Sequence, residues 1–556
     1  MNRGTRAVAL ATAALVLTAC GGPAAPTTGL KNTDDVQLED VNRTDPGKLR
    51  DGGELRWPVS QLADNWNNFE LSGTHVDGYR MISTVMPSLF VQKADATVAT
   101  NPDYLLDAKL VSSSPQVVTY RLNPRARWSD GRAFSWEDFA AQATALSGRA
   151  AGYRVALTAG YEDIAEVERG ESDQDVKVTF ARTYAEWRGL FSPLYPKQAM
   201  ASAEAFNTGW RDGPKLTAGP FKVGTVDPTA RFVTVVRDDA WWGARPKLDK
   251  ITFRQVDKPA LAEALANGAI DLYEVGSSID LFTRAQSIPG VVTRQALTPD
   301  YLHLTFGSAG ALADPRLRVA LMRGVDTRNI TKALLGKMVR DEAHVVGNHL
   351  YLLGSPHYAD NSAVASFDVE AARRELDALG WRLNGEYRAK DGAELTVRFV
   401  GPTPNPVSDQ VSKLLQSQFK TIGVQLSIEA VPATEYFKGY VNVGNFDITC
   451  FGWKKGPYPI SSSKGIYDLD PANVNQNYGR VGNDTINRLI REGTAELDDA
   501  KRADLANRLD QEIWRAGHQL PLYQLPGAVA IRSTLANAGA IGAASPPEWV
   551  SIGFTG

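Results

Sequence analysis

The chain has 556 residues, of which 43% are hydrophobic and 22% charged, and its formal net charge is −3. This length allows two or three domains of ordinary size, and the composition is that of a globular protein. A mildly acidic chain has no excess of basic residues to neutralise a phosphate backbone, so we expect no nucleic-acid partner.

The chain opens with a short apolar segment that ends at a cysteine. Two arginines precede residues 7–17, an apolar run that is followed by Thr18, Ala19 and Cys20. A basic stretch, a short apolar stretch and small residues before a cleavage site are typical of an export signal. The run is about half of the roughly 20 residues that a membrane-spanning helix needs, so we expect it to be removed.

Residues 17–20 resemble the lipobox of bacterial lipoproteins. The resemblance implies a signal peptide at residues 1–19, a diacylglycerol group on the Cys20 thiol, and a protein held on the outer side of the cell membrane by lipid. A plain secretory signal with an incidental cysteine is the alternative. Without the signal the net charge falls to −5. Residues 20–50 are rich in glycine, proline and small polar residues, which predicts a flexible tether.

The folded part is predicted to begin near residue 52, with a first strand at residues 54–57. Residues 117–122 place alternate apolar side chains on one face, as a half-buried strand does. Ser135 is the predicted N-cap of a helix, and Asp138 follows it in a variant of the capping box.

Two later stretches each predict a strand, a helix closed by glycine and a second strand of the parallel type. The first covers residues 251–275, and its helix ends at Gly268. The second covers residues 395–428, and its helix ends at Gly423. Parallel sheets are covered by helices on both faces, so this pattern predicts an α/β protein, with the two units in different lobes.

Amphipathic spacing predicts two more helices, near residues 486–497 and 505–513. Cys450 is the remaining cysteine once Cys20 carries lipid, so no internal disulfide is expected. Its neighbours predict a strand, in which Cys450 is a buried small apolar residue rather than a reactive thiol.

No catalytic constellation is recognisable. The chain lacks a G-x-S-x-G elbow, an S-x-x-K set with its partner motifs, an H-E-x-x-H helix and a glycine-rich phosphate loop. His344, His349 and His357 are separated by five and eight residues, which does not place them on one helix face. We interpret them as solvated or internally hydrogen-bonded, and we expect no enzyme, no metal and no cofactor.

A series of motifs spans residues 52–525. The first is residues 123–139, which include Trp128 in the run Trp-Ser-Asp-Gly, and the others are residues 217–221, 237–249, 266–271, 312–327 and 367–381. In this order they resemble the signature of family 5 extracellular solute-binding proteins, the oligopeptide- and dipeptide-binding lipoproteins of ABC importers. Trp128 and Trp242, both in these motifs, are interpreted as core anchors.

The resemblance implies a two-lobed periplasmic-binding-protein-like fold, with an extra subdomain in lobe one and a ligand cleft between the lobes. Lobe one is assigned residues 51–298, lobe two residues 299–515, and residues 516–556 return to lobe one. The crossings are expected near residues 297–301 and 516–523. A ligand that bridges both lobes stabilises the closed form, which a permease can recognise.

The chain departs from the family pattern at one position. In peptide-binding members a tryptophan is followed three residues later by an aspartate that pairs with the ligand's N-terminal ammonium. Trp453 matches the tryptophan, but Gly456 stands where the carboxylate belongs, after Lys454 and Lys455. A buried ammonium without a carboxylate is unfavourable by several kcal/mol, which counts against recognition of a free N-terminus by position 456. The alternative is that this departure has no bearing on the ligand and that Lys454 and Lys455 are simply solvated.

The cleft is predicted to be lined by aromatic and amide side chains from loops that follow predicted strands. Such side chains bind peptide backbone or sugar rings alike. The predicted set is Trp66 and Asn67 from lobe one, with Trp453, Tyr458, Tyr467, Asn477 and Tyr478 from lobe two. Ordinary core packing is the alternative for about half of them.

The sequence thus predicts a monomeric, lipid-anchored substrate-binding protein of an ABC transporter. We expect it to capture peptides or a solute of similar size and to deliver them to the permease subunits in the membrane. The alternative is a regulatory or structural lipoprotein of the same fold that binds an envelope component or a protein partner.

Overall fold

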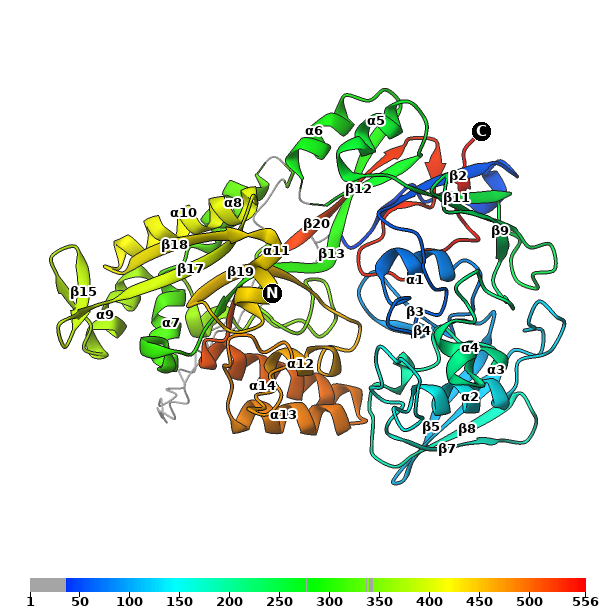
Figure 1. Ribbon diagram of the computed structural model, residues 1–556, viewed down its shortest axis with the longest axis horizontal. Coiled ribbons are helices and arrows are strands. Elements are labelled where there is room, and N and C mark those ends of the chain that lie inside the picture. The colour runs from blue at the N-terminus through cyan, green and yellow to red at the C-terminus, as the bar shows by residue number, and fades with distance from the viewer. Residues whose placement is uncertain (1–36, 277, 337, 340–343) are drawn as a thin grey trace, which may run out of the picture. The chain divides into compact units, whose positions relative to one another are not determined.

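The computed structural model describes residues 37–556 with the exception of 277, 337 and 340–343 (Figure 1). The predicted export signal and Cys20 lie outside the described residues. In the part that is described, no helix combines the length and the hydropathy that crossing a membrane requires.

The end of the predicted tether is part of the fold. Strand β1 (Asp40–Val41) pairs antiparallel with β22 (Gly539–Ala540), and Arg294 donates a hydrogen bond of 3.0 Å to the Asp40 carboxylate. The prediction that the whole of residues 20–50 is a flexible tether is therefore wrong from Asp40 onward. Polar composition alone could not reveal partners that lie some hundreds of residues later in the chain.

Residues of the first half of the chain, joined by the C-terminal residues, enclose one apolar core. We call it the first core; it includes Trp57, Phe139 and Phe253 from early elements and Leu535 and Trp549 from the end of the chain. Its helices include α1 (Val76–Ile82), α2 (Trp136–Leu146), α3 (Lys197–Met200) and α4 (Ala203–Asn207).

Antiparallel pairing dominates the sheets around the first core. One sheet has the order β2 (Glu54–Val59), β11 (Lys250–Gln255), β10 (Phe232–Arg237), β9 (Phe221–Asp227), in which only β2 and β11 are parallel. Another has the order β5 (Leu105–Ser113), β6 (Gln116–Leu122), β8 (Asp175–Phe180), β7 (Ile164–Arg169). Short pairs join β3 (Phe90–Gln92) to β4 (Val98–Thr100) and β21 (Leu535–Ala536) to β23 (Gly553–Phe554). The strands predicted at 54–57 and 117–122 are confirmed as β2 and β6.

The first family motif is built around the buried carboxylate of Asp138. This carboxylate accepts hydrogen bonds from the Ser135 amide at 3.2 Å and the Trp128 indole at 3.2 Å, and it forms an ion pair with Arg132 at 2.9 Å. Ser135 is the N-cap of α2, as predicted. Trp128 is 1% exposed, which confirms it as a core anchor, and the half-buried Trp242 packs against the same core.

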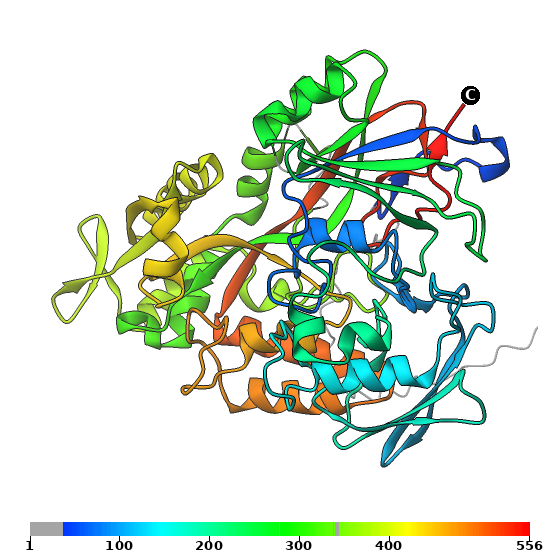
Figure 2. The same ribbon diagram turned by 45° about the vertical axis from the view of Figure 1, so that its right-hand side comes forward.

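A mixed sheet runs from the first core into a second one. Its order is β12 (Leu272–Gly276), β20 (Gln519–Arg532), β13 (Val291–Phe306), β19 (Ile448–Lys454), β17 (Thr396–Thr403), β18 (Gln425–Pro432). Strands β13 and β20 run side by side along most of their length (Figure 2). Their register shifts between Leu297 and Tyr301, inside the predicted crossing. Ala296 packs in the first core, whereas Leu304 packs in the second.

The second predicted strand–helix–strand unit is confirmed, and the first is not. Strands β17 and β18 are parallel and are connected by α10 (Pro406–Thr421), which lies along them in Figure 1. In the first unit, β11 and β12 flank α5 (Leu261–Ala266) but belong to different sheets. Both edges of β11 are already taken, by β2 and β10, so β12 pairs with β20 instead.

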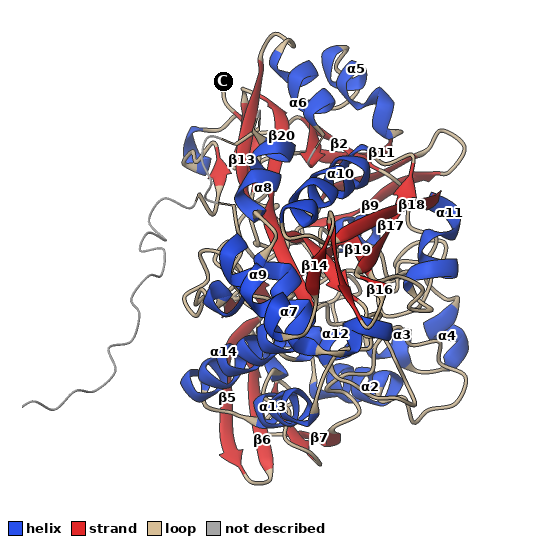
Figure 3. Ribbon diagram, turned by 90° about the vertical axis from the view of Figure 1, so that its left-hand side faces the viewer, coloured by secondary structure: helices blue, strands red, loops and turns tan. Residues whose placement is uncertain are grey.

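Helices cover the second core, which includes Leu304, Phe399, Leu415 and Trp514. They are α7 (Pro315–Arg323), α8 (Thr327–Leu335), α9 (Val369–Ala378), α10 and α14 (Asp499–Ala516), and α7 contacts both α9 and α14 (Figure 3). Helices α13 (Asp484–Ala495) and α14 are the two predicted late helices. Cys450 is buried on β19, as predicted.

The remaining short elements lie around this framework. Helix α6 (Ile279–Gln286) packs near β13, and β14 (Arg382–Asn384), β15 (Tyr387–Lys390) and β16 (Ala393–Glu394) form a small antiparallel sheet before β17. Helix α11 (Ala433–Glu435) follows β18 and α12 (Lys464–Tyr467) follows β19.

Candidate ligand-binding site

A cavity of about 320 Å³ lies between segments on the side of the first core and segments around a third apolar cluster, which includes Leu350, Tyr351, Ile460 and Ile513. Residues 96–98, Ala185, Glu186 and Arg188 line it from the side of the first core. Residues 350–352, 355–357, 456–459, Asp499 and Arg502 line it from the other side. A larger cavity, of about 690 Å³, is enclosed by segments on the first-core side alone. We take the smaller one as the candidate site because it joins both sides and contains Gly456, and ligand pockets favour such domain interfaces.

The two sides touch directly beside the cavity. The Ala185 amide donates a hydrogen bond of 3.0 Å to the Thr494 carbonyl. The Tyr458 ring lies against the backbone of Gly189, where an added Cβ atom would be only 2.6 Å from its Cε2 atom. Glycine is therefore the residue that permits this approach.

Glu186 places a carboxylate in this enclosed region. The residue is 3% exposed, and its carboxylate oxygens make no hydrogen bond of ordinary geometry, although the Ser461 hydroxyl and the Ile460 and Ser461 amides are nearby donors. Burial raises the pKa of Glu186 to about 7, because the nearby Ser461 hydroxyl and Arg502 offset the loss of hydration only in part.

Trp453 belongs to an aromatic cluster on β19, three residues before Gly456. Its indole stacks on His303 with an interplanar angle of 7° and on Tyr478 with one of 15°, both with ring centroids 6.0 Å apart. The edge of Phe451 packs at 5.2 Å. The indole Nε1 is buried without a hydrogen-bond partner. Trp453 does not line the 320 Å³ cavity itself.

Lys455 is not solvated, so this alternative is wrong for one of the two lysines. Its side chain turns inward, and the residue is 7% exposed, whereas Lys454 is exposed. The ammonium group donates hydrogen bonds of 2.8 Å to the carbonyls of Asn348 and Tyr351. Burial lowers the pKa of Lys455 to about 7, and the Asp510 carboxylate opposes this shift.

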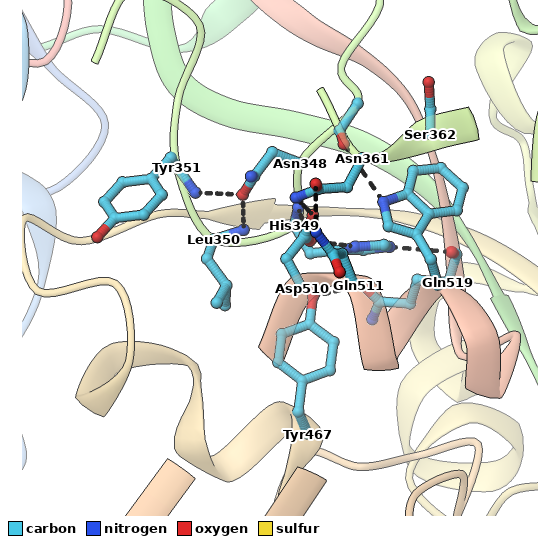
Figure 4. A network of polar contacts seen from close by, with 12 residues as sticks. Asn348, His349, Leu350, Tyr351, Asn361, Ser362, Tyr467, Asp510, Gln511 and Gln519 are labelled. Carbon is cyan, nitrogen blue, oxygen red and sulfur yellow. Dashed lines mark hydrogen bonds and ion pairs between the residues drawn. The ribbon is translucent and has the colours of Figure 1, made fainter. Parts of the chain in front are cut away.

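Behind Lys455 lies a buried polar network centred on His349 and Asp510 (Figure 4). His349 Nδ1 is 2.7 Å from Asp510 Oδ1, and Nε2 is 3.0 Å from the Gln519 carbonyl. Both ring nitrogens thus face oxygen atoms, so the imidazole is held on both sides within the network. Asn361 donates to the second Asp510 oxygen at 2.6 Å. His349 is accordingly an internally hydrogen-bonded histidine, one of the two predicted interpretations.

The two predicted site residues of lobe one lie inside the first core. Trp66 is 2% exposed, and its carbonyl accepts a hydrogen bond of 2.8 Å from the Tyr195 hydroxyl. Asn67 is 1% exposed and donates to the Phe206 carbonyl at 2.9 Å. Side chains enclosed in this way offer no surface to a ligand.

Two predicted residues of lobe two are also enclosed. The Tyr467 hydroxyl donates to Gln519 Oε1 at 2.9 Å, and Asn477 exchanges hydrogen bonds with the Val481 backbone at 2.8 and 3.1 Å. Each residue is 1% exposed. Of the remaining three, Tyr458 lines the cavity, and Trp453 and Tyr478 share the aromatic cluster.

The sequence interpretation missed Glu186 and the inward turn of Lys455. Glu186 follows Tyr184 and Ala185 and precedes Trp187. A single carboxylate among apolar and aromatic residues is the sequence signal that could have indicated a buried acidic group. Alternation along β19, continued past its end, would have placed Lys454 and Lys455 on opposite faces, but it does not say which of the two turns inward.

The chain matches the family model described as bacterial extracellular solute-binding proteins, family 5 Middle, over residues 60–468. It is 39% identical over 551 residues to the oligopeptide-binding protein OppA of Mycobacterium tuberculosis, and the alignment covers 97% of this chain and 92% of the relative.

Solved structures show the same fold. The periplasmic EDTA-binding protein EppA superposes with a TM-score of 0.82 at 23% identity, over 94% of this chain and 99% of EppA. The oligopeptide-binding protein AppA from Bacillus subtilis, in complex with a nonapeptide, gives a TM-score of 0.69 at 17% identity, over 92% of this chain and all of AppA. The first and second cores are thus those of two α/β lobes, which we call lobe one and lobe two. The chain belongs to the bacterial extracellular solute-binding proteins of family 5.

Proposed function

We propose that the protein is the lipid-anchored substrate-binding subunit of an ABC importer and that it captures peptides between its lobes. The observation that carries this proposal is its 39% identity, along nearly its whole length, to a protein named as an oligopeptide-binding protein. The cavity between residues 184–189 of lobe one and 456–459 of lobe two supports it, because ligands of two-lobed proteins bind at such interfaces.

Tyr458, Trp453 and Tyr478 are the proposed ligand contacts. Tyr458 lines the cavity and contributes an apolar ring with a polar hydroxyl. Trp453 and Tyr478 are partly buried rings stacked on each other, and their remaining exposed faces suit the apolar parts of a peptide. Binding and release need no bond to be made or broken, so the proposed role involves no catalysis.

Closure links capture to delivery. A peptide that contacts both lobes binds the closed form more tightly than the open form. This difference in binding free energy is what shifts the protein toward the closed form. We propose that the membrane permease recognises the closed form and that the diacylglycerol on Cys20 keeps the receptor in the plane of the membrane. The protein acts as a monomer in this scheme.

Native mass spectrometry of the full-length protein, extracted in detergent from its own cells, tests the proposal. We expect co-purifying peptides, and thermal unfolding should shift upward when a peptide pool is added back. A cleft that is empty and that no peptide pool stabilises would favour the regulatory or structural alternative. In the same cells, replacing Cys20 by serine should release the protein from the membrane fraction.

A further inference from the structure

The cavity contains a buried carboxylate without a cationic partner. Both oxygens of Glu186 are buried, and neither makes a hydrogen bond of ordinary geometry among the described residues. The Ser461 hydroxyl and the backbone amides of Ile460 and Ser461 are nearby donors, but none of them carries a positive charge. Buried polar groups in folded proteins nearly always have partners, and a buried charge without one is strongly unfavourable. A carboxylate of this kind in the wall of a cavity indicates a site at which a ligand supplies the missing positive partner.

The cationic side chains at the cavity do not neutralise Glu186. Arg502 forms an ion pair with Asp499 and donates a hydrogen bond of 2.9 Å to the Glu496 carbonyl. The Arg188 guanidinium lies over the Trp187 ring, 4.4 Å from its centroid. The other titratable groups around Glu186 or along the cavity wall are Tyr184, Tyr351, Tyr458 and His357.

Glu186 and Gly456 line the same cavity from opposite lobes. At Gly456 there is no side chain, and an added Cβ atom would lie 3.2 Å from the Ser462 Cβ atom, so the space there is tight. On the Gly456 side the Asp499 carboxylate is already paired with Arg502, so the carboxylate without a cationic partner is Glu186, on the other side of the cavity. A cavity of about 320 Å³ is at the lower end of known ligand pockets, enough for one end of a peptide.

We propose that Glu186 is the carboxylate that binds the N-terminal ammonium group of a peptide ligand, in place of a carboxylate at position 456. The inference rests on the proposed peptide-binding function. An ammonium group supplies three N–H donors, and its pairing with a carboxylate gives strong charge-assisted hydrogen bonds. Tyr458, beside Gly456, contributes a hydroxyl as a further acceptor at the same cavity.

This arrangement makes the ammonium group part of the closing mechanism. Without ligand, closing the lobes buries the Glu186 carboxylate with no counter-charge, which disfavours the closed form. A bound ammonium removes this penalty and favours the ionised carboxylate, so its pKa falls from about 7 on binding. Ligands with a blocked N-terminus lack this effect, so the receptor selects peptides with free N-termini.

The test uses pairs of peptides drawn from those that co-purify with the protein, each with a free and with an acetylated N-terminus. Calorimetric titration at pH 7.5 should show that acetylation weakens binding to the unmodified protein by about 50-fold or more. Glu186→Gln should weaken binding of the free peptide by a similar factor and leave binding of the acetylated peptide within about threefold. Glu171→Gln, an exposed carboxylate on the surface of lobe one, is the matched control, for which the preference should remain.

The possible outcomes separate the inference from the function on which it rests. If the unmodified protein binds neither form of any peptide, the proposed function fails. If it binds both forms equally, or if Glu186→Gln keeps the full preference for the free N-terminus, peptide binding stands and the role of Glu186 is overturned. The comparison of the two peptides on the unmodified protein needs no variant, so misfolding of Glu186→Gln cannot hide the answer.

Discussion

The Lys455 ammonium lies 4.6 Å from the centre of the Tyr301 ring, so the residue after β19 is attached to the strand β13 that crosses between the lobes. The same ammonium donates to the carbonyls of Asn348 and Tyr351. Gly456, the next residue, lines the ligand cavity. Lys455 therefore fixes one wall of the cavity relative to the crossing strand.

Lys455→Ala should lower the free energy of unfolding by about 2–4 kcal/mol, because it leaves two buried carbonyls without a donor. Lys454→Ala, one residue earlier and exposed, should change it by less than about 0.5 kcal/mol. Denaturant titration of both variants at pH 8 makes the comparison. At this pH a neutral Lys455 amine still has two N–H donors for the two carbonyls. Equal stabilities of the two variants would contradict the assigned role.

Trp453→Ala and Trp66→Ala should separate binding from stability. Trp66 is enclosed in the first core, so its truncation should lower the free energy of unfolding by about 3–5 kcal/mol. Trp453 is partly exposed beside Tyr478, so its truncation should weaken peptide binding by about 10-fold, with a smaller loss of stability. Calorimetric titration and chemical unfolding of both variants give the two quantities. Unchanged affinity in Trp453→Ala would remove it from the proposed site.

The stability of the unliganded protein should depend on pH through Glu186. Its pKa is raised from 4.5 in the unfolded chain to about 7 in the folded one, so the folded state is favoured below pH 4.5 and loses this advantage as pH rises through 7. At pH 8 the ionised carboxylate costs about 3 kcal/mol. Glu186→Gln removes the charge, so it should stabilise the protein by about that amount at pH 8 and have little effect at pH 4.

Thermal unfolding at the two pH values checks this expectation, with Glu171→Gln as the exposed control. The gain in stability of Glu186→Gln at pH 8 is expected only if Glu186 is also buried in the unliganded protein. If Glu186→Gln is no more stable than the unmodified protein at pH 8, the contact between residues 184–189 and 458–461 is open in the unliganded protein.

Gly527→Ala should disturb the crossing between the lobes. An added Cβ atom at Gly527 would lie 2.8 Å from the Ala296 carbonyl oxygen and would also meet the Thr298 side chain. Strands β13 and β20 must then separate next to the shift in their register. We expect a loss of about 1–3 kcal/mol of stability. Gly452→Ala, on the neighbouring β19, would make only an ordinary contact of 3.5 Å and is the control. Similar effects of both variants on the unfolding midpoint would refute the steric explanation.

Periodic patterns explain why much of the fold was predictable. The alternation at residues 117–122, the N-cap at Ser135 and the glycine-terminated helix before β18 each depend on neighbours within a few residues, and the structure confirms all three. The pairing of β12 with β20 was not predictable in this way. It depends on which strand edges remain free after distant segments have paired.

The candidate site was only partly predictable for the same reason. Residue type selected Tyr458, which lines the cavity, and Trp453 and Tyr478, which stack on each other, but it also selected Trp66, Asn67, Tyr467 and Asn477, whose amides, hydroxyls and rings are enclosed by the fold. Aromatic and amide residues serve cores and clefts equally well. Burial, which separates the two uses, is a property of segments brought together from far apart in the chain.

By itself, the sequence determined the secondary structure that local spacing encodes, the family through its ordered motifs, and the absence of a carboxylate at Gly456. Only the tertiary structure decided that Lys455 turns inward while Lys454 does not, and that Glu186 brings a carboxylate to the cavity that Gly456 lines. The physical reason is that the burial and the pKa of a charged side chain depend on the residues that surround it in the folded protein. Ile460, Ser461 and Arg502, which act on the pKa of Glu186 along with its loss of hydration, are adjacent to it only after folding.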